Sequence, residues 1–110
     1  MDSQIISQPP VRTFSVILQG TPAGYGQTNI TNAAVGLPSL PTGANKAIVQ
    51  IETGDSVRWR DDGVAPTASV GNLLYPANLI VLENAQSISQ FQVIGVTGGG
   101  VTLNVNYYVR

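Results

Sequence analysis

The sequence predicts an all-β fold, an antiparallel β-sandwich or jelly-roll-like barrel built from roughly six to seven short strands. Three observations lead to this prediction. Apolar and polar residues alternate with a period of two in several segments, whereas helical periodicity does not recur. Glycine and proline, 12 and 7 in number, gather between these segments. The length of 110 residues fits one domain, so we expect an extended arm over residues 1–10 and a single β-sandwich domain over residues 11–110.

The N-terminal segment contains the expected arm and the first strand. Pro9-Pro10 stiffens the chain and disfavours both a helix and a central strand, which predicts an extended arm; a disordered tail is the alternative. Over residues 12–18 alternate positions are apolar, which is typical of a half-buried strand.

Residues 20–45 are predicted to form a long loop rich in glycine and proline, with a short strand over residues 28–34. A loop of this length is unusual inside a compact domain and more often has a function or contacts a partner. We therefore treat it as a candidate contact region.

Two strands over residues 46–52 and 56–60 are predicted to form a hairpin. The turn chemistry of Thr53-Gly54-Asp55 separates them. Alternation then assigns each side chain to one face of the sheet. Expected inward are Ala47, Val49, Ile51, Val57 and Trp59, with the single tryptophan at the centre of the core, and expected outward are Lys46, Gln50, Glu52, Ser56, Arg58 and Arg60.

The C-terminal third holds three further strands. Residues 79–82 are almost wholly apolar, which predicts a strand buried on both faces that a partner could cover. Residues 90–96 and 101–109 are predicted to form a hairpin with Gly98-Gly99-Gly100 as its tight turn. Expected inward are Phe91, Val93, Val101, Leu103, Val105, Tyr107 and Val109, and expected outward are Gln90, Gln92, Thr102, Asn104, Asn106 and Tyr108.

The composition predicts a neutral surface. Ser, Thr, Asn and Gln together number 33, whereas 11 residues are charged, or 10% of the chain against roughly 25% in ordinary domains. Such a surface loses little on burial because no full charges must be desolvated. This fits a protein that works inside an assembly; a secreted or stress-tolerant single domain is the alternative.

Charge and hydropathy disfavour several partners. A formal net charge of −1 offers no attraction to nucleic acid or to an anionic membrane. No run of 18 apolar residues occurs, so no segment is expected to span a bilayer. Met1-Asp2-Ser3-Gln4 lacks the basic start of a signal peptide, which predicts synthesis and use from the cytoplasm.

The residue types also argue against catalysis. Without cysteine or histidine, the Ser/His/Asp and Cys/His nucleophile systems and the usual zinc sites are excluded. Glycoside hydrolysis needs one carboxyl group with a raised pKa, and arginines beside Asp61 and Asp62 would lower their pKa values instead. We expect no enzyme, no cofactor and no small-molecule substrate.

Most of the charges fall within one short segment. These are Glu52, Asp55, Arg58, Arg60, Asp61 and Asp62. We predict a structural salt-bridge network in which Asp61 or Asp62 caps a turn. The alternatives are an ion pair between subunits and a calcium site at Asp61-Asp62-Gly63, although the spacing of an EF-hand is absent.

Tyr107 and Tyr108 raise the question of a carbohydrate-binding face made of aromatic and amide side chains. Neighbouring residues on an alternating strand point to opposite faces, so these two rings are not expected to form one stacking platform.

One stretch resembles a known group of proteins. Val57-Arg58-Trp59-Arg60-Asp61-Asp62-Gly63 is followed by Pro66-Thr67 and by Gly71 and Leu73, and the chain ends with Phe91, Val93, Gly95 and Val105-Asn106-Tyr107-Tyr108. This pattern, which covers residues 46–110, is similar to that of small virion proteins encoded in tailed-phage structural gene clusters. The resemblance implies membership of a particle without fixing a position in it.

Together these observations lead us to expect a capsid decoration, or cement, protein that bridges major capsid subunits and oligomerises, with a trimer favoured. A tail or head-to-tail joining subunit is the alternative, and a glycan- or receptor-binding module is an alternative of another class. The candidate interface residues are Ile5, Ile6, Pro9, Pro10, Tyr25, Ile30, Leu37, Leu40, Arg58, Arg60, Asp61, Asp62 and Tyr108.

Overall fold

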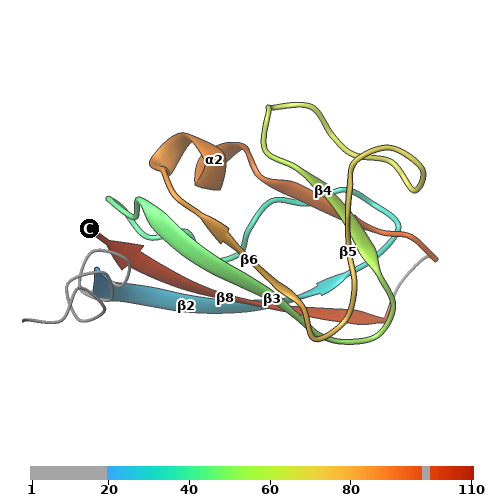
Figure 1. Ribbon diagram of the computed structural model, residues 1–110, viewed down its shortest axis with the longest axis horizontal. Coiled ribbons are helices and arrows are strands. Elements are labelled where there is room, and N and C mark those ends of the chain that lie inside the picture. The colour runs from blue at the N-terminus through green and yellow to red at the C-terminus, as the bar shows by residue number, and fades with distance from the viewer. Residues whose placement is uncertain (1–19, 98–99) are drawn as a thin grey trace, which may run out of the picture.

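The computed structural model describes residues 20–97 and 100–110, which form two antiparallel sheets (Figure 1). The strands are β2 (Thr21–Ile30), β3 (Lys46–Thr53), β4 (Val57–Arg60), β5 (Asn72–Leu74), β6 (Leu79–Leu82), β7 (Gln92–Gly95) and β8 (Val101–Val109), and one short helix is α2 (Ala85–Gln90). The predicted all-β sandwich is confirmed. The predicted arm over residues 1–10 and the predicted strand over residues 12–18 lie outside the described residues.

The larger sheet has four strands in the order β2-β8-β3-β6, and the smaller has three in the order β5-β4-β7. The loop after β2 joins the smaller sheet through a single bridge. There the Val35 and Val93 main chains exchange hydrogen bonds of 3.0 and 2.8 Å. The outer strands of the described sheets are therefore β2 and β6 in one and β5 and β7 in the other.

The core fills the space between the sheets and is supplied mainly by alternate residues of β3 and β8. Its fully buried side chains include Val49, Ile51, Val57, Phe91, Val93, Leu103, Val105 and Tyr107. The predicted alternation of β8 is confirmed except at Val109, which is exposed because it stands opposite Thr21 at the end of the sheet.

Trp59 is not the centre of the core, contrary to the prediction. It is partly buried and packs against the core cluster. Its ring stacks on Phe91 with centroids 5.5 Å apart and an interplanar angle of 19°. The central aromatic is Tyr107, whose hydroxyl donates to the Pro38 carbonyl at 2.5 Å. Burial raises the pKa of Tyr107 to about 12.

Both predicted hairpins are wrong. β3 has β8 on one side and β6 on the other, so the chain after Thr53 crosses to the second sheet instead of turning back. β8 likewise lies between β2 and β3, whereas β7 pairs with β4. Gly54 permits the first crossing because its φ is +106° and a Cβ there would lie 2.5 Å from the Gly100 carbonyl oxygen.

The predicted loop over residues 20–45 is shorter than expected, and the strand placed at residues 28–34 overlaps only the end of the observed strand. Residues 21–30 form β2, the longest strand of the described chain. Pro22 is compatible with this position because β2 is an outer strand of the sheet as far as it is described. Gly26 leaves room for the returning loop, since a Cβ there would lie 2.8 Å from the Pro38 carbonyl oxygen.

The helix α2 was not predicted. Asn84 is its N-cap and accepts a hydrogen bond from the Ser87 main-chain nitrogen at 2.8 Å. Ile88 is the one buried residue of the helix, and the strand expected from residue 90 begins at Gln92.

Within the described chain, no helix is long and apolar enough to cross a membrane.

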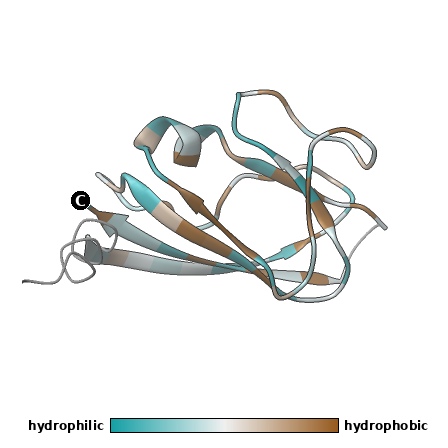
Figure 2. Cartoon of the chain, in the orientation of Figure 1, coloured by the Kyte–Doolittle hydropathy of each residue, from teal (hydrophilic) through white to brown (hydrophobic). Residues whose placement is uncertain are grey.

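Two burial predictions for the larger sheet are also wrong. β6 was expected to be buried on both faces, but Leu79 and Val81 are 54% and 42% exposed because they point away from the core, in register with Gln50 and Ile48 of β3. Figure 2 shows this apolar strand at the border of the sheet. Lys46 was expected to be exposed but is only 4% exposed, and its ammonium lies over the Tyr108 ring, 5.6 Å from the ring centre.

Candidate functional site

The outer face of the four-stranded sheet is a regular surface to which all four strands contribute. Strand register places alternate residues of all four strands on it. They are Tyr25, Gln27 and Asn29 from β2, Thr102, Asn104, Asn106 and Tyr108 from β8, Ile48 and Gln50 from β3, and Leu79 and Val81 from β6, with Glu52 at the end of β3. We call this set the outer face. Apart from Lys46, whose ammonium Tyr108 covers, Glu52 is its only charged residue.

A row of side-chain hydrogen bonds crosses the outer face from β2 over β8 to β3. The Tyr25 hydroxyl and the Gln27 amide nitrogen each lie 2.8 Å from Asn104 Oδ1. Asn104 Nδ2 donates to Glu52 Oε1 at 2.7 Å, and Gln27 Nε2 lies 3.3 Å from the same oxygen. These four side chains, which we call the amide row, hold one another in place although all are accessible to solvent. A partner would therefore meet a surface whose polar groups are already oriented.

The predicted salt bridge and turn cap are confirmed at one pair on the opposite side of the molecule. Arg60 Nε and one terminal nitrogen lie 3.0 and 2.5 Å from the two carboxylate oxygens of Asp62. Asp62 also accepts from the Val64 main chain at 3.4 Å, which closes the turn. The Arg60 hydrogen bond lowers the pKa of Asp62, and Asp62 in turn raises the pKa of Arg60.

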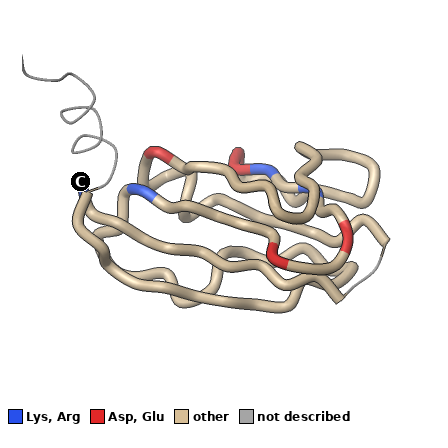
Figure 3. Tube along the Cα trace, turned by 60° about the horizontal axis from the view of Figure 1, so that its bottom comes forward, with Lys and Arg blue, Asp and Glu red and all other residues tan. Residues whose placement is uncertain are grey.

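The remaining charges of the cluster act separately rather than as one network. Arg58 donates to the Ala68 and Gly71 carbonyls at 3.1 and 2.9 Å and so holds the β4–β5 loop. Asp61 accepts from the Ser87 hydroxyl at 2.9 Å. Asp55 accepts from the Thr97 hydroxyl and from the Ser56 main chain, both at 2.7 Å, and these bonds lower its pKa, the Thr97 bond most. Figure 3 shows how sparse charged residues are elsewhere along the chain.

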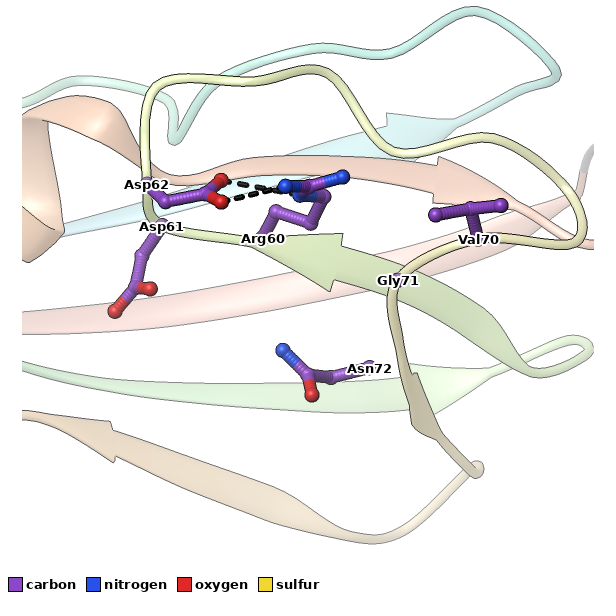
Figure 4. A pocket seen from close by; sticks show the side chains of 6 residues that line it. All are labelled: Arg60, Asp61, Asp62, Val70, Gly71 and Asn72. Atoms are coloured by element: carbon purple, nitrogen blue, oxygen red, sulfur yellow. Dashed lines mark hydrogen bonds and ion pairs between the residues drawn. The ribbon is translucent and has the colours of Figure 1, made fainter.

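A shallow pocket of about 320 Å³ lies beside the Arg60–Asp62 pair. It is lined by Arg60, Asp61, Asp62, Val70, Gly71 and Asn72 (Figure 4). The Asp62 carboxylate faces the guanidinium, whereas Asp61 points away from it. Over residues 20–97 and 100–110, no three carboxylates come together as ligands for a cation. The charges that line the pocket are thus already paired, Arg60 with Asp62 in the turn and Asp61 with the Ser87 hydroxyl of α2.

Apart from the four charged residues described above, the predicted interface residues fall into three groups. Tyr25 and Leu40 are 55% and 46% exposed, and Tyr108 is partly exposed on the outer face. Ile30 is fully buried in the core and Leu37 packs against that core, so the interface prediction is wrong for Ile30. Ile5, Ile6, Pro9 and Pro10 lie outside the described residues.

Sequence reasoning missed two exposed groups of residues. The amide row joins residues that are distant along the chain, so only the register of three strands reveals it. The exposed apolar side chains of β5, β6 and the turn between them, Leu73, Tyr75, Leu79 and Val81, were also missed as a group. Their signal was the apolar run over residues 79–82, whose length does not distinguish a central strand from an edge strand.

Comparisons with known proteins identify no relative. No protein-family model matches the chain, and no curated protein or solved structure matches it either. The likeness to tailed-phage virion proteins therefore stays a prediction.

Proposed function

We propose that this protein is a structural subunit of a bacteriophage virion, most specifically a capsid decoration protein that stabilises the head by bridging major capsid subunits. It is made in the host cytoplasm and acts without catalysis or cofactor. The resemblance of residues 46–110 to tailed-phage virion proteins suggests that the protein belongs to such a particle. The composition and geometry of the outer face are the observation that supports binding to capsid subunits as the mode of action.

The outer face suits burial against another protein. Its polar groups are amides and hydroxyls, and its main carboxylate, Glu52, already accepts hydrogen bonds from Gln27 and Asn104. Covering such a surface costs less than covering unpaired charges. The tyrosines at its β2 and β8 strands add the aromatic area that interface centres favour.

The proposed mechanism is mass action. A subunit that binds the assembled shell, but not its separated parts, stabilises the shell by about 2.7 kcal/mol per site at a free concentration of 100 Kd. Oligomerisation would multiply this effect, because each further contact in one oligomer becomes intramolecular.

Binding to particles tests the outer face directly. Particles stripped of this protein are mixed with the purified chain and sedimented, with wild type compared against Gln27→Glu. The substitution sets a second carboxylate against Glu52, and we expect at least a tenfold loss of co-sedimentation. Gln86→Glu, on the exposed side of α2, adds the same charge elsewhere and should bind like wild type. Equal binding of both variants would exclude the outer face as the contact.

The number of copies per particle distinguishes a head decoration protein from a tail or head-to-tail joining subunit. A decoration protein should give a band near 11.5 kDa with a stoichiometry comparable to that of the major capsid protein. A tail or head-to-tail joining subunit would be far scarcer. A few copies per particle would end the decoration proposal and favour the joining role.

One observation favours a second candidate, a glycan-binding module. Tyr25 is exposed beside the amide row, and aromatic rings next to amide and carboxylate groups suit sugar hydroxyls and ring faces. A glycan array decides: binding that is lost in Tyr25→Ala but kept in Tyr75→Ala, an equally exposed tyrosine away from the outer face, would support this function. No binding at any glycan would exclude it.

A further inference from the structure

Among the residues that the structure describes, β6 has β3 on one side and no strand on the other. Edge strands normally carry a feature that prevents pairing with another chain, such as lysine, proline or a bulge. The sequence of β6, Leu-Ile-Val-Leu, has neither lysine nor proline, and its register with β3 has no shift. Over residues 20–97 and 100–110, this edge therefore has neither a neighbouring strand nor one of these features.

The main chain of β6 alternates between β3 and the open edge. The Ile51 nitrogen donates to the Asn78 carbonyl at 3.3 Å, in line with the β3–β6 register. Hydrogen-bonded residues alternate along an antiparallel ladder. Ile80 and Leu82 accordingly direct their N–H and C=O groups toward β3, and Leu79 and Val81 direct theirs to the open edge.

We propose that β6 pairs antiparallel with β6 of a second copy of this chain, across a two-fold axis at Ile80. Two four-stranded sheets then become one continuous sheet. In this register Leu79 stands opposite Val81 of the partner subunit, and Val81 stands opposite Leu79 of the partner subunit. These are the residues whose main-chain groups point outward, so each pair exchanges both of its hydrogen bonds.

The proposed register also places compatible side chains of the two copies opposite each other. Leu79 and Val81 share the outer face, so the pairing keeps apolar residues of both copies on one side of the joined sheet. Glu83 comes opposite Ala77 of the partner subunit, and each Glu83 keeps its own Arg110 at 3.2 Å. No like charges meet. A shift by one residue would set outward-facing against inward-facing side chains and break this match.

Strand pairing over four residues is too small for a stable interface, which buries about 800 Å² on each partner. The connection between β5 and β6, which is only residues 75–78 long, can add to this area. Tyr75 is 55% exposed there and extends the apolar surface of the β6 edge, whereas Leu73 pairs with Arg58 and points to the outer side of the smaller sheet.

This inference goes beyond the proposed virion role and does not depend on it, because it concerns the isolated full-length chain. A closed two-fold pair uses the same surface on both copies. It also differs from the trimer expected from the sequence, so the mass of the oligomer separates the two.

Analytical ultracentrifugation with paired variants tests the pairing. Wild type should sediment with twice the mass of the 11.5 kDa chain. Val81→Lys places a charge on the edge and should give the monomer, whereas Val70→Lys, an equally large change at an exposed valine of the β4–β5 loop, should leave the dimer intact. Circular dichroism shows that each variant is folded. A monomeric or trimeric wild type, or a dimer unaffected by Val81→Lys, would overturn the proposal.

Disulfide trapping tests the register. The chain has no cysteine, so one substitution introduces a single reactive site. Ile80 faces Ile80 of the partner subunit as a non-hydrogen-bonded pair, with Cα atoms about 4.5 Å apart, which suits a disulfide. Ile80→Cys should form a covalent dimer under mild oxidation, and Ile48→Cys on β3 should not. A folded Ile80→Cys protein that stays monomeric, or equal trapping of both variants, would refute the two-fold pairing.

Discussion

The two sheets of the sandwich differ in where their polar groups find partners. On the three-stranded sheet, Arg58, Arg60 and Asp62 bond within the β4–β5 loop and hold its turns. On the four-stranded sheet, the amide row and the β6 edge face outward, with groups that another molecule can still reach. The charged cluster is thus structural, whereas the uncharged surface is available for binding. In a chain with so few charges, the charged residues stabilise local structure, and we propose that the amide and apolar residues form the interface.

The largest effect on stability is expected from removing the Trp59 side chain, which packs the smaller sheet against the core. Trp59→Ala deletes the ring that stacks on Phe91 and packs against the core. Because Trp59 is only partly buried, we expect a loss at the lower end for such a truncation, about 3 kcal/mol. Urea unfolding followed by circular dichroism measures it. A loss below about 1 kcal/mol would show that the smaller sheet does not depend on this contact.

The next largest effect is expected at Arg58. Arg58→Met keeps the aliphatic length but removes two hydrogen bonds to the carbonyls of Ala68 and Gly71. We expect the free energy of unfolding to fall by about 2 kcal/mol, since charge-assisted bonds contribute more than neutral ones. Faster proteolysis within residues 61–71 should accompany the loss. Unchanged stability would place the cluster among surface charges with no structural role.

The fold class and the inward faces of the strands could be predicted, but the pairing of strands could not. Alternation shows which side chains of β3 and β8 face the core and says nothing about which strands are neighbours. Gly54 and Asp55 suit a hairpin as well as a crossing between sheets. The crossing occurs because β6 and β8 occupy both sides of β3, a long-range arrangement that local turn chemistry does not encode.

The candidate site likewise has one part that could be predicted from the sequence and one part that could not. Arg60 and Asp62 are two positions apart, so their ion pair could be predicted from neighbouring residues alone. The amide row joins Gln27, Glu52 and Asn104, which meet only after three strands pair in one register. The apolar run of β6 was recognised, but the exposure of Leu79 and Val81 depends on the outer side of the sheet being uncovered, which the run does not show.

Lowering the pH should reduce the stability of the folded chain, because the carboxylates whose pKa values are lowered, Asp55 and Asp62, stabilise local turns rather than the outer face. The pKa values of Asp55 and Asp62 lie below those of the unfolded chain, owing first to the Thr97 and Arg60 hydrogen bonds, respectively. Their stabilising contribution is therefore complete above about pH 4 and is lost as the pH falls through the folded pKa values. Urea unfolding between pH 7 and pH 2 should show this decline. Asp62→Asn should flatten it, and a slope identical to that of wild type would contradict the assignment.

The smallest effect is expected within the amide row. Asn104→Ala removes the side chain that joins Tyr25, Gln27 and Glu52, yet water can replace these exposed hydrogen bonds. We expect the free energy of unfolding to fall by less than about 1 kcal/mol. Binding to particles should nevertheless drop at least as much as in Gln27→Glu, because the remaining side chains lose their orientation and must be ordered on contact. A variant that is strongly destabilised, or one that binds like wild type, would mean that the row supports the fold rather than the interface.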